Sequence, residues 1–109
     1  MKWDLEFFSG EVRQEIYAWP RGVRAVFIRI AQRMQSNGPN LGMPFTRAIG
    51  NGLFEIRAKG REGIGRAFFC FLVRRKIIIL HGFIKKTDKT PPTELATAVR
   101  RMKEVKHGQ

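Results

Sequence analysis

Apolar and polar residues alternate from Lys2 to Phe8, at the start of the chain. Trp3, Leu5 and Phe7 fall on one side of this stretch, and the residues between them are charged. An alternation with a period of two is typical of a strand that buries one face. The pattern therefore predicts a short, half-buried β-strand at the N-terminus.

The period then changes to that of an α-helix. Ser9 is a suitable cap for a first helix that stops at Pro20, and a second helix is predicted from Gly22 to Ser36. The apolar positions, three or four residues apart, are Val12, Ile16 and Trp19 in the first helix and Val23, Val26/Phe27, Ile30 and Met34 in the second. Each helix is thus expected to bury one apolar stripe.

Three further strands are predicted in the middle of the chain. They run from Leu53 to Lys59, from Ile64 to Val73 and from Ile77 to about Ile84. Gly50-Asn51-Gly52 marks a corner before the first of them, and residues 42–49 are compatible with a short strand. The short connections between these strands favour an antiparallel meander.

A last helix is predicted near the C-terminus. Thr90 is a suitable N-cap, with Pro91 at the first helical position. The apolar stripe of this helix consists of Leu95, Ala98/Val99, Met102 and Val105. The order of elements predicts one α+β domain over residues 1–109, with an N-terminal strand and two helices packed on a small antiparallel sheet, then a C-terminal helix. Two helices on one face would leave the other face of the sheet partly open.

The charge of the chain points to a kind of partner. The 109 residues contain 21 Lys and Arg against nine Asp and Glu, a formal net charge of +12. Eleven of the basic residues and only three acidic ones lie in residues 41–90. This concentration favours a polyanion such as nucleic acid. Because it follows the strand region rather than one amphipathic helix, it argues against a membrane-surface role.

Several classes of protein are disfavoured by what the sequence lacks. The N-terminus has no apolar signal-peptide core, and the longest apolar run, Ile77 to Leu80, is too short to span a bilayer. We therefore expect a cytoplasmic protein. Cys70 is the single cysteine and lies in an apolar run, which indicates a core residue. With no Cys/His cluster in the sequence, neither a metal nor another cofactor is expected.

Side chains alternate across a strand, so the three central strands can be divided into faces. Arg57 shares a face with Glu55 and Lys59, and Arg66 shares one with Phe68. In the third strand the predicted common face carries Ile77, Ile79, His81, Phe83 and Lys85. Pairing Arg57 with Arg66 beside Lys85 and Lys86 would gather several cations on one surface.

Such a cation cluster suits the cleavage of RNA. The 2′-OH attacks the adjacent phosphorus, and the extra negative charge of the transition state is stabilised by fixed Arg and Lys donors. Phe68, Phe69 or Phe83 could stack on a base nearby if exposed. A solvated surface is the simpler interpretation for Arg74-Arg75-Lys76 at a turn, whereas Lys59 and Arg61 fit either role.

Arg57 and Arg66 differ from the other cations because they lie inside strands among apolar residues, which favours a functional role. His81 is left open between a core residue and a catalytic one. Tyr17 is interpreted as a packing residue and His107 as an inert residue of the C-terminal tail.

Several segments together resemble the HigB-like branch of the RelE toxin superfamily, whose members are often described as phage-derived. The segments are Gly52-Leu53-Phe54-Glu55-Ile56-Arg57, Arg66-Ala67-Phe68-Phe69, Ile79-Leu80-His81-Gly82-Phe83-Ile84-Lys85-Lys86-Thr87 and Lys89-Thr90-Pro91. The helix from Glu94 to Met102 continues the resemblance, which covers residues 20–102.

The resemblance implies a microbial-ribonuclease-like fold and metal-independent cleavage of mRNA in the ribosomal A site. It also implies neutralisation by a cognate antitoxin, usually an Xre-type helix-turn-helix protein, with operator DNA bound only through the toxin–antitoxin complex. By position, Arg57 and Arg66 would contact the scissile phosphate. Lys85 and Lys86 would add phosphate contacts, and His81 is a further catalytic candidate. The residues expected to bind RNA around them are Lys59, Arg61, Arg74, Lys76, Phe83 and Lys89.

The chain departs from RelE itself at two places. Leu53 and Glu55 stand where RelE has paired lysines, and RelE's late catalytic Tyr has no counterpart, so the general base is left open. Besides a nuclease toxin, two other classes fit the sequence. One is a non-catalytic RNA- or ribosome-binding module that blocks translation by occupancy, and the other is a basic phage accessory protein without nuclease activity.

Overall fold

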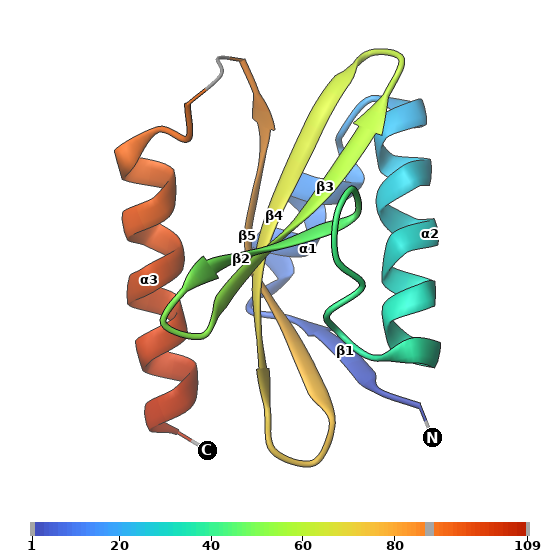
Figure 1. Cartoon of the computed structure of the whole chain (residues 1–109). Helices are drawn as coiled ribbons and strands as arrows, with labels where there is room; N and C mark the ends of the chain where they lie inside the picture. The colour runs from blue at the N-terminus through green and yellow to red at the C-terminus, as the bar shows by residue number, and fades with distance from the viewer. Residues whose placement is uncertain (1, 87–88, 109) are drawn as a thin grey trace.

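The fold is described from a computed structural model, which covers residues 2–86 and 89–108. Its elements are β1 (Asp4–Phe7), α1 (Gly10–Tyr17), α2 (Arg21–Asn37), β2 (Thr46–Gly50), β3 (Leu53–Gly60), β4 (Gly63–Leu72), β5 (Lys76–Lys85) and α3 (Pro92–His107) (Figure 1). Thr87, which belongs to one of the segments quoted above, lies outside the described residues. The α+β prediction and its order of elements are confirmed. No helix in the described part of the chain is long and apolar enough to cross a membrane.

The five strands form one mixed sheet in the order β1-β5-β4-β3-β2. Strands β2 to β5 are antiparallel neighbours, as the short turns predict. The N-terminal strand lies within the same sheet, where β1 pairs with β5 in parallel, from Asp4↔Lys76 to Phe7↔Ile79. The sequence did not predict this pairing, because it joins two strands that are far apart along the chain.

Helices cover both faces of the sheet. Helices α1 and α2 pack on one face and α3 lies against the other (Figure 1). The α1/α2 face contains the larger apolar cluster, with Trp19, Phe27 and Phe69 fully enclosed. The α3 face contains a smaller cluster around Phe68, Leu80, Ala98 and Met102. Because α3 buries only part of its apolar stripe, this second face stays partly open.

A β-bulge in β5 changes the predicted assignment of faces. Phe68 pairs with His81 whereas Phe69 pairs with Ile79, so Leu80 is an extra residue in the ladder. As a result Ile77 and Ile79 belong to the α1/α2 cluster, while Phe83 lies in the α3 cluster and His81 contacts α3. The prediction that all of these residues share one face was therefore wrong.

The helix caps confirm one prediction and correct another. The Ser9 hydroxyl accepts a hydrogen bond from the Val12 backbone N–H at 3.3 Å and caps α1 as expected. Helix α3 instead begins at Pro92, with Pro91 in the N-cap position and no side-chain cap. Thr90 is not the cap, and its hydroxyl oxygen accepts a hydrogen bond from Arg66.

Two strand glycines make room for the side chain of Trp19. A methyl group added at Gly65 would meet the Trp19 ring from the sheet side, with three ring atoms closer than van der Waals contact. Gly82, on the neighbouring strand, approaches Ile16 and Trp19 in the same way. The sheet can therefore approach α1 and the Trp19 ring only because both positions lack a side chain.

We expect Gly65→Ala to destabilise the protein by about 2 kcal/mol, because the added methyl group overpacks a site that has no space for it. Thermal denaturation of the purified protein measures the effect. The matched variant Gly10→Ala adds a methyl group where no atom lies within 4 Å, and it should leave the melting temperature within a few degrees of the wild type. Equal melting temperatures for the two variants would contradict the packing described here.

Candidate functional site

Three adjacent rows of cross-strand neighbours on the α3 face of the sheet contain the candidate residues, and each row also includes one apolar residue. The rows, read across β3, β4 and β5, are Lys59–Ile64–Lys85, Arg57–Arg66–Phe83 and Glu55–Phe68–His81. Arg57 and Arg66 are direct cross-strand partners, a pairing that the sequence allowed but did not fix. The short β3–β4 turn fixes this register, and the rows place Lys85 and His81 on either side of the arginine pair.

Arg66 is held by a buried network of polar groups. Only 3% of the residue is exposed, and its Nη1 donates hydrogen bonds to Glu55 Oε2 at 3.4 Å and to Thr90 Oγ1 at 3.3 Å. The Glu55 carboxylate is fully buried, and its Oε1 also lies 2.8 Å from Nη2 of the half-exposed Arg47. Burial lowers the pKa of Arg66, although the neighbouring Glu55 opposes that shift. The network fixes the Arg66 guanidinium on the sheet.

Arg57 and Arg66 leave donors unsatisfied at this place. The Nε–H groups of both residues are buried and have no hydrogen-bond acceptor among the described residues. Directly opposed side chains on neighbouring strands lie about 5 Å apart at Cβ, and like charges in such pairs repel each other. The proximity of Arg57 also contributes to the lowered pKa of Arg66. Two adjacent guanidinium groups concentrate positive charge at this place, which favours a bound anion.

His81 forms a close pair with α3. Its Nε2 lies 2.7 Å from Glu94 Oε1, and the His81 side chain is 19% exposed. The imidazole ring also stacks on Phe83, with ring centroids 6.1 Å apart. Arg101 of α3 donates to the backbone oxygen of Leu80 at 2.9 Å, at the bulge. The bulge and α3 together position His81 beside the arginine row.

A small cavity opens next to these rows. Its volume is about 330 Å³, and its walls include Arg47, Phe68 and Thr90. Phe68 is the middle residue of the Glu55–Phe68–His81 row, and Thr90 contacts Arg66. The cavity therefore lies beside the arginine network and has a volume near the lower end of the range for small-ligand sites.

The remaining lysines and arginines predicted for this site lie at its border. Lys59 is exposed at the end of its row, Arg61 is exposed in the β3–β4 turn, and Lys86 is exposed just beyond the end of β5. Lys89 is exposed in the segment before α3. Of the predicted Lys85–Lys86 pair, only Lys85 belongs to the rows.

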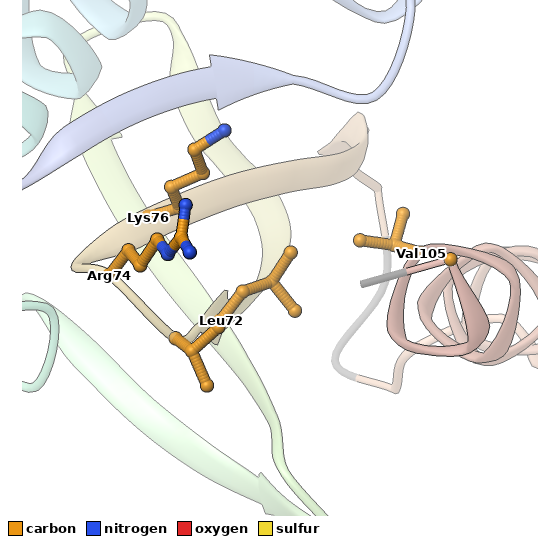
Figure 2. A pocket seen from close by; sticks show the side chains of 6 residues that line it. Leu72, Arg74, Lys76 and Val105 are labelled. Atoms are coloured by element: carbon orange, nitrogen blue, oxygen red, sulfur yellow. The ribbon is translucent and has the colours of Figure 1, made fainter.

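Arg74 and Lys76 are not part of this arrangement. Both lie at the β4–β5 turn, beyond the opposite end of β4, and the strand alone separates Arg66 from its last residue by about 20 Å. Figure 2 shows their side chains with Leu72 and Val105 around a separate pocket of about 460 Å³. Lys76 also forms an ion pair with Glu6 at 3.5 Å. The structure therefore does not bring Arg74 and Lys76 together with the arginine pair, and their contact with RNA stays a prediction.

The aromatic residues proposed for base stacking are buried. Phe68 and Phe69 are fully enclosed, and Phe83 is only 6% exposed between Phe68 and His81. They support the sheet and do not offer a ring to solvent. The prediction that Cys70 is a core residue is confirmed, and burial raises the pKa of its thiol.

Comparison with known protein families assigns the chain to one of them. A model of the family described as "Phage derived protein Gp49-like (DUF891)" matches residues 14–103. The chain belongs to the Gp49-like family. This is a RelE-like family related to toxin–antitoxin systems, and membership suggests that the protein partners an antitoxin. No curated protein matches the chain significantly.

The Gp49-like match includes all three rows and the contacts from α3. Four residues that complete the site were not recognised from the sequence as candidates: Arg47, Glu55, Thr90 and Glu94. Glu55 carried a usable signal, since a carboxylate inside a strand on the same face as Arg57 needs a cationic partner when buried. The other three gave no signal, because each joins the site from a segment whose docking the sequence does not fix.

Proposed function

We propose that this protein is the toxin of a type II toxin–antitoxin system, of the HigB-like kind, that cleaves mRNA on the ribosome. The cognate antitoxin would be an Xre-type helix-turn-helix protein that neutralises it. Family membership supports the toxin class at a general level. The net charge of +12 supports a nucleic-acid substrate.

The cross-strand pair of Arg57 and Arg66 is the observation that carries this proposal. Glu55 offsets part of the charge of Arg66, but two like charges opposite each other repel, and the buried Nε–H groups of both arginines have no acceptor among the described residues, so a further anion would stabilise the pair. A phosphodiester provides that anion, and arginine donates to phosphate oxygens in a planar, bidentate geometry.

Cleavage would use these groups in the following way. The 2′-oxygen of the RNA attacks the adjacent phosphorus and the 5′-oxygen leaves, so one proton is removed and one is delivered. Charge accumulates on the non-bridging oxygens, where Arg57 and Arg66 stabilise it more than in the ground state. His81 is the candidate for proton transfer, and Glu94 orients its ring. Lys85 adds positive charge on the other side of the arginine row.

Induced expression in bacteria tests the proposal. A ribosome-dependent nuclease should arrest growth and produce mRNA cut at defined codon positions, detected by mapping 5′ ends. Arrest with intact transcripts would instead indicate a binding module that blocks translation. Normal growth at a confirmed level of soluble protein would contradict the toxin assignment.

We expect Glu94→Gln to lower the rate of mRNA cleavage about tenfold, which corresponds to about 1.4 kcal/mol in the barrier. The variant keeps the shape of the side chain but removes the charge that faces His81 Nε2. Single-turnover cleavage on purified ribosomes measures the effect. Glu104→Gln, an exposed change on the same helix, is the matched control. If both variants cleave at the wild-type rate, Glu94 does not position a reacting group.

A further inference from the structure

A second and larger groove runs between α3 and the β2–β3 hairpin. Its volume is about 720 Å³, and its apolar lining consists of Ile49, Leu53, Leu95, Val99 and Met102. The basic groups Lys103, Lys106 and His107 also line it, and none of its described lining residues is acidic. The groove thus has an apolar floor and a positively charged border.

One stripe of α3 forms a whole wall of this groove. Leu95, Val99, Met102 and Lys106 follow each other at intervals of three or four residues, so they lie on one side of the helix. At about 1.5 Å of rise per residue, this wall is about 16 Å long, or three helical turns. The ammonium group of Lys106 lies close to Gly52 of the hairpin turn.

The other end of the groove leads to the candidate site. Ile49 and Leu95 line both the groove and the smaller cavity beside Arg47 and Thr90. A segment bound along the groove would therefore end next to the arginine network. The groove itself contains none of the cations of the three rows.

We infer that this groove binds an acidic amphipathic helix of a partner protein, which, if the proposed function holds, is the antitoxin. Apolar side chains on one face of that helix would fill the floor, as in other helix-in-groove complexes. Glu or Asp residues on its border would face Lys103, Lys106 and His107. Because the two cavities share Ile49 and Leu95, the bound helix would end beside the cavity at Arg47 and Thr90.

Two synthetic helical peptides provide the probe. Both carry Leu at the spacing i, i+4, i+7 and i+11, and their remaining positions are mainly Glu in one and mainly Lys in the other. We expect the labelled Glu peptide to bind the full chain in fluorescence anisotropy, and the Lys peptide to bind at least tenfold more weakly. If the Glu peptide does not bind at about 100 µM, the free energy of binding is too small for a specific complex, and the inference is overturned.

Variants locate the binding to the groove. The double change Lys103→Glu/Lys106→Glu should weaken binding of the Glu peptide at least tenfold, and Val99→Asp should do the same by placing a charge on the apolar wall. The matched control, Arg21→Glu/Arg29→Glu, makes the same change in net charge on exposed positions of α2 and should bind like the wild type. Equal losses in both double variants would mean nonspecific attraction and would overturn the inference.

The same variants separate this inference from the proposed function. The Lys103→Glu/Lys106→Glu variant should still arrest growth when expressed alone, because both lysines lie outside the three rows and outside the apolar cluster under α3. If the wild type causes no arrest but the peptide binds in the groove, the nuclease proposal fails and the docking surface stands. If the groove variants lose binding to an RNA oligonucleotide and not to the peptide, the groove takes nucleic acid and the inference is overturned.

Discussion

Replacing Arg57 with methionine is expected to lower mRNA cleavage on the order of 100-fold while leaving thermal stability unchanged or raised. The loss in rate is that of one transition-state donor. Stability should not fall, because Arg57 opposes Arg66 across the strands and its buried Nε–H has no acceptor among the described residues. Methionine keeps the apolar part of the side chain. Single-turnover cleavage and thermal denaturation measure the two properties separately.

A control on the same strand tests whether the loss in cleavage rate is specific to Arg57. Lys59→Met removes a cation from the same face, two residues along β3, but at an exposed position. It should cost at most a few-fold in rate. If Arg57→Met lowers stability and leaves cleavage unchanged, Arg57 is a structural residue and the phosphate site must lie elsewhere.

Arg66→Ala should also lose activity on the order of 100-fold. Its effect on stability differs, because Arg66 is one of two partners of the buried Glu55. The sequence gives no reason to expect this effect, since a strand arginine gives no sign of its partner. The structure instead predicts a less stable variant, so Arg57 is the cleaner test of function.

The site could be predicted from the sequence where local pattern decides the geometry. Alternation located β3 and β4 and the faces of Arg57 and Arg66, but the register that pairs the two arginines came only from the structure. The same reasoning failed in β5, since a bulge at Leu80 moves Ile79 and His81 to opposite faces. Nothing in the apolar run from Ile77 marks where the extra residue sits.

Contacts from distant segments could not be predicted for a different reason. Thr90 was assigned to a helix cap, a local role, but its hydroxyl satisfies Arg66, which is 24 residues away along the chain. The pair of His81 and Glu94 exists only because α3 packs on this face of the sheet. Sequence spacing says nothing about such packing, so the sequence could not identify Glu94 as the partner of His81.

The largest effect on stability is expected from Glu55→Leu, which removes the buried carboxylate between Arg47 and Arg66. Arg47 is 44% exposed along its side chain and can turn to solvent, but Arg66 cannot. An unpaired buried guanidinium costs about 3 kcal/mol or more. For a chain of this size that corresponds to a fall in melting temperature of more than about 10 °C. The exposed change Glu15→Gln on α1 serves as the control and should shift the melting temperature by no more than about 2 °C.

A second substitution distinguishes the loss of an ion pair from the loss of packing. Glu55→Leu combined with Arg66→Met replaces both partners by apolar groups of similar size, and such replacements recover most of the stability of a buried pair. We therefore expect the double variant to melt close to the wild type and above the single variant, while remaining inactive. If the double variant is no more stable than Glu55→Leu, the carboxylate supports the fold through other contacts. If it is stable and still cleaves mRNA, Arg66 does not bind the scissile phosphate, because the guanidinium that the sheet holds in place has been removed without loss.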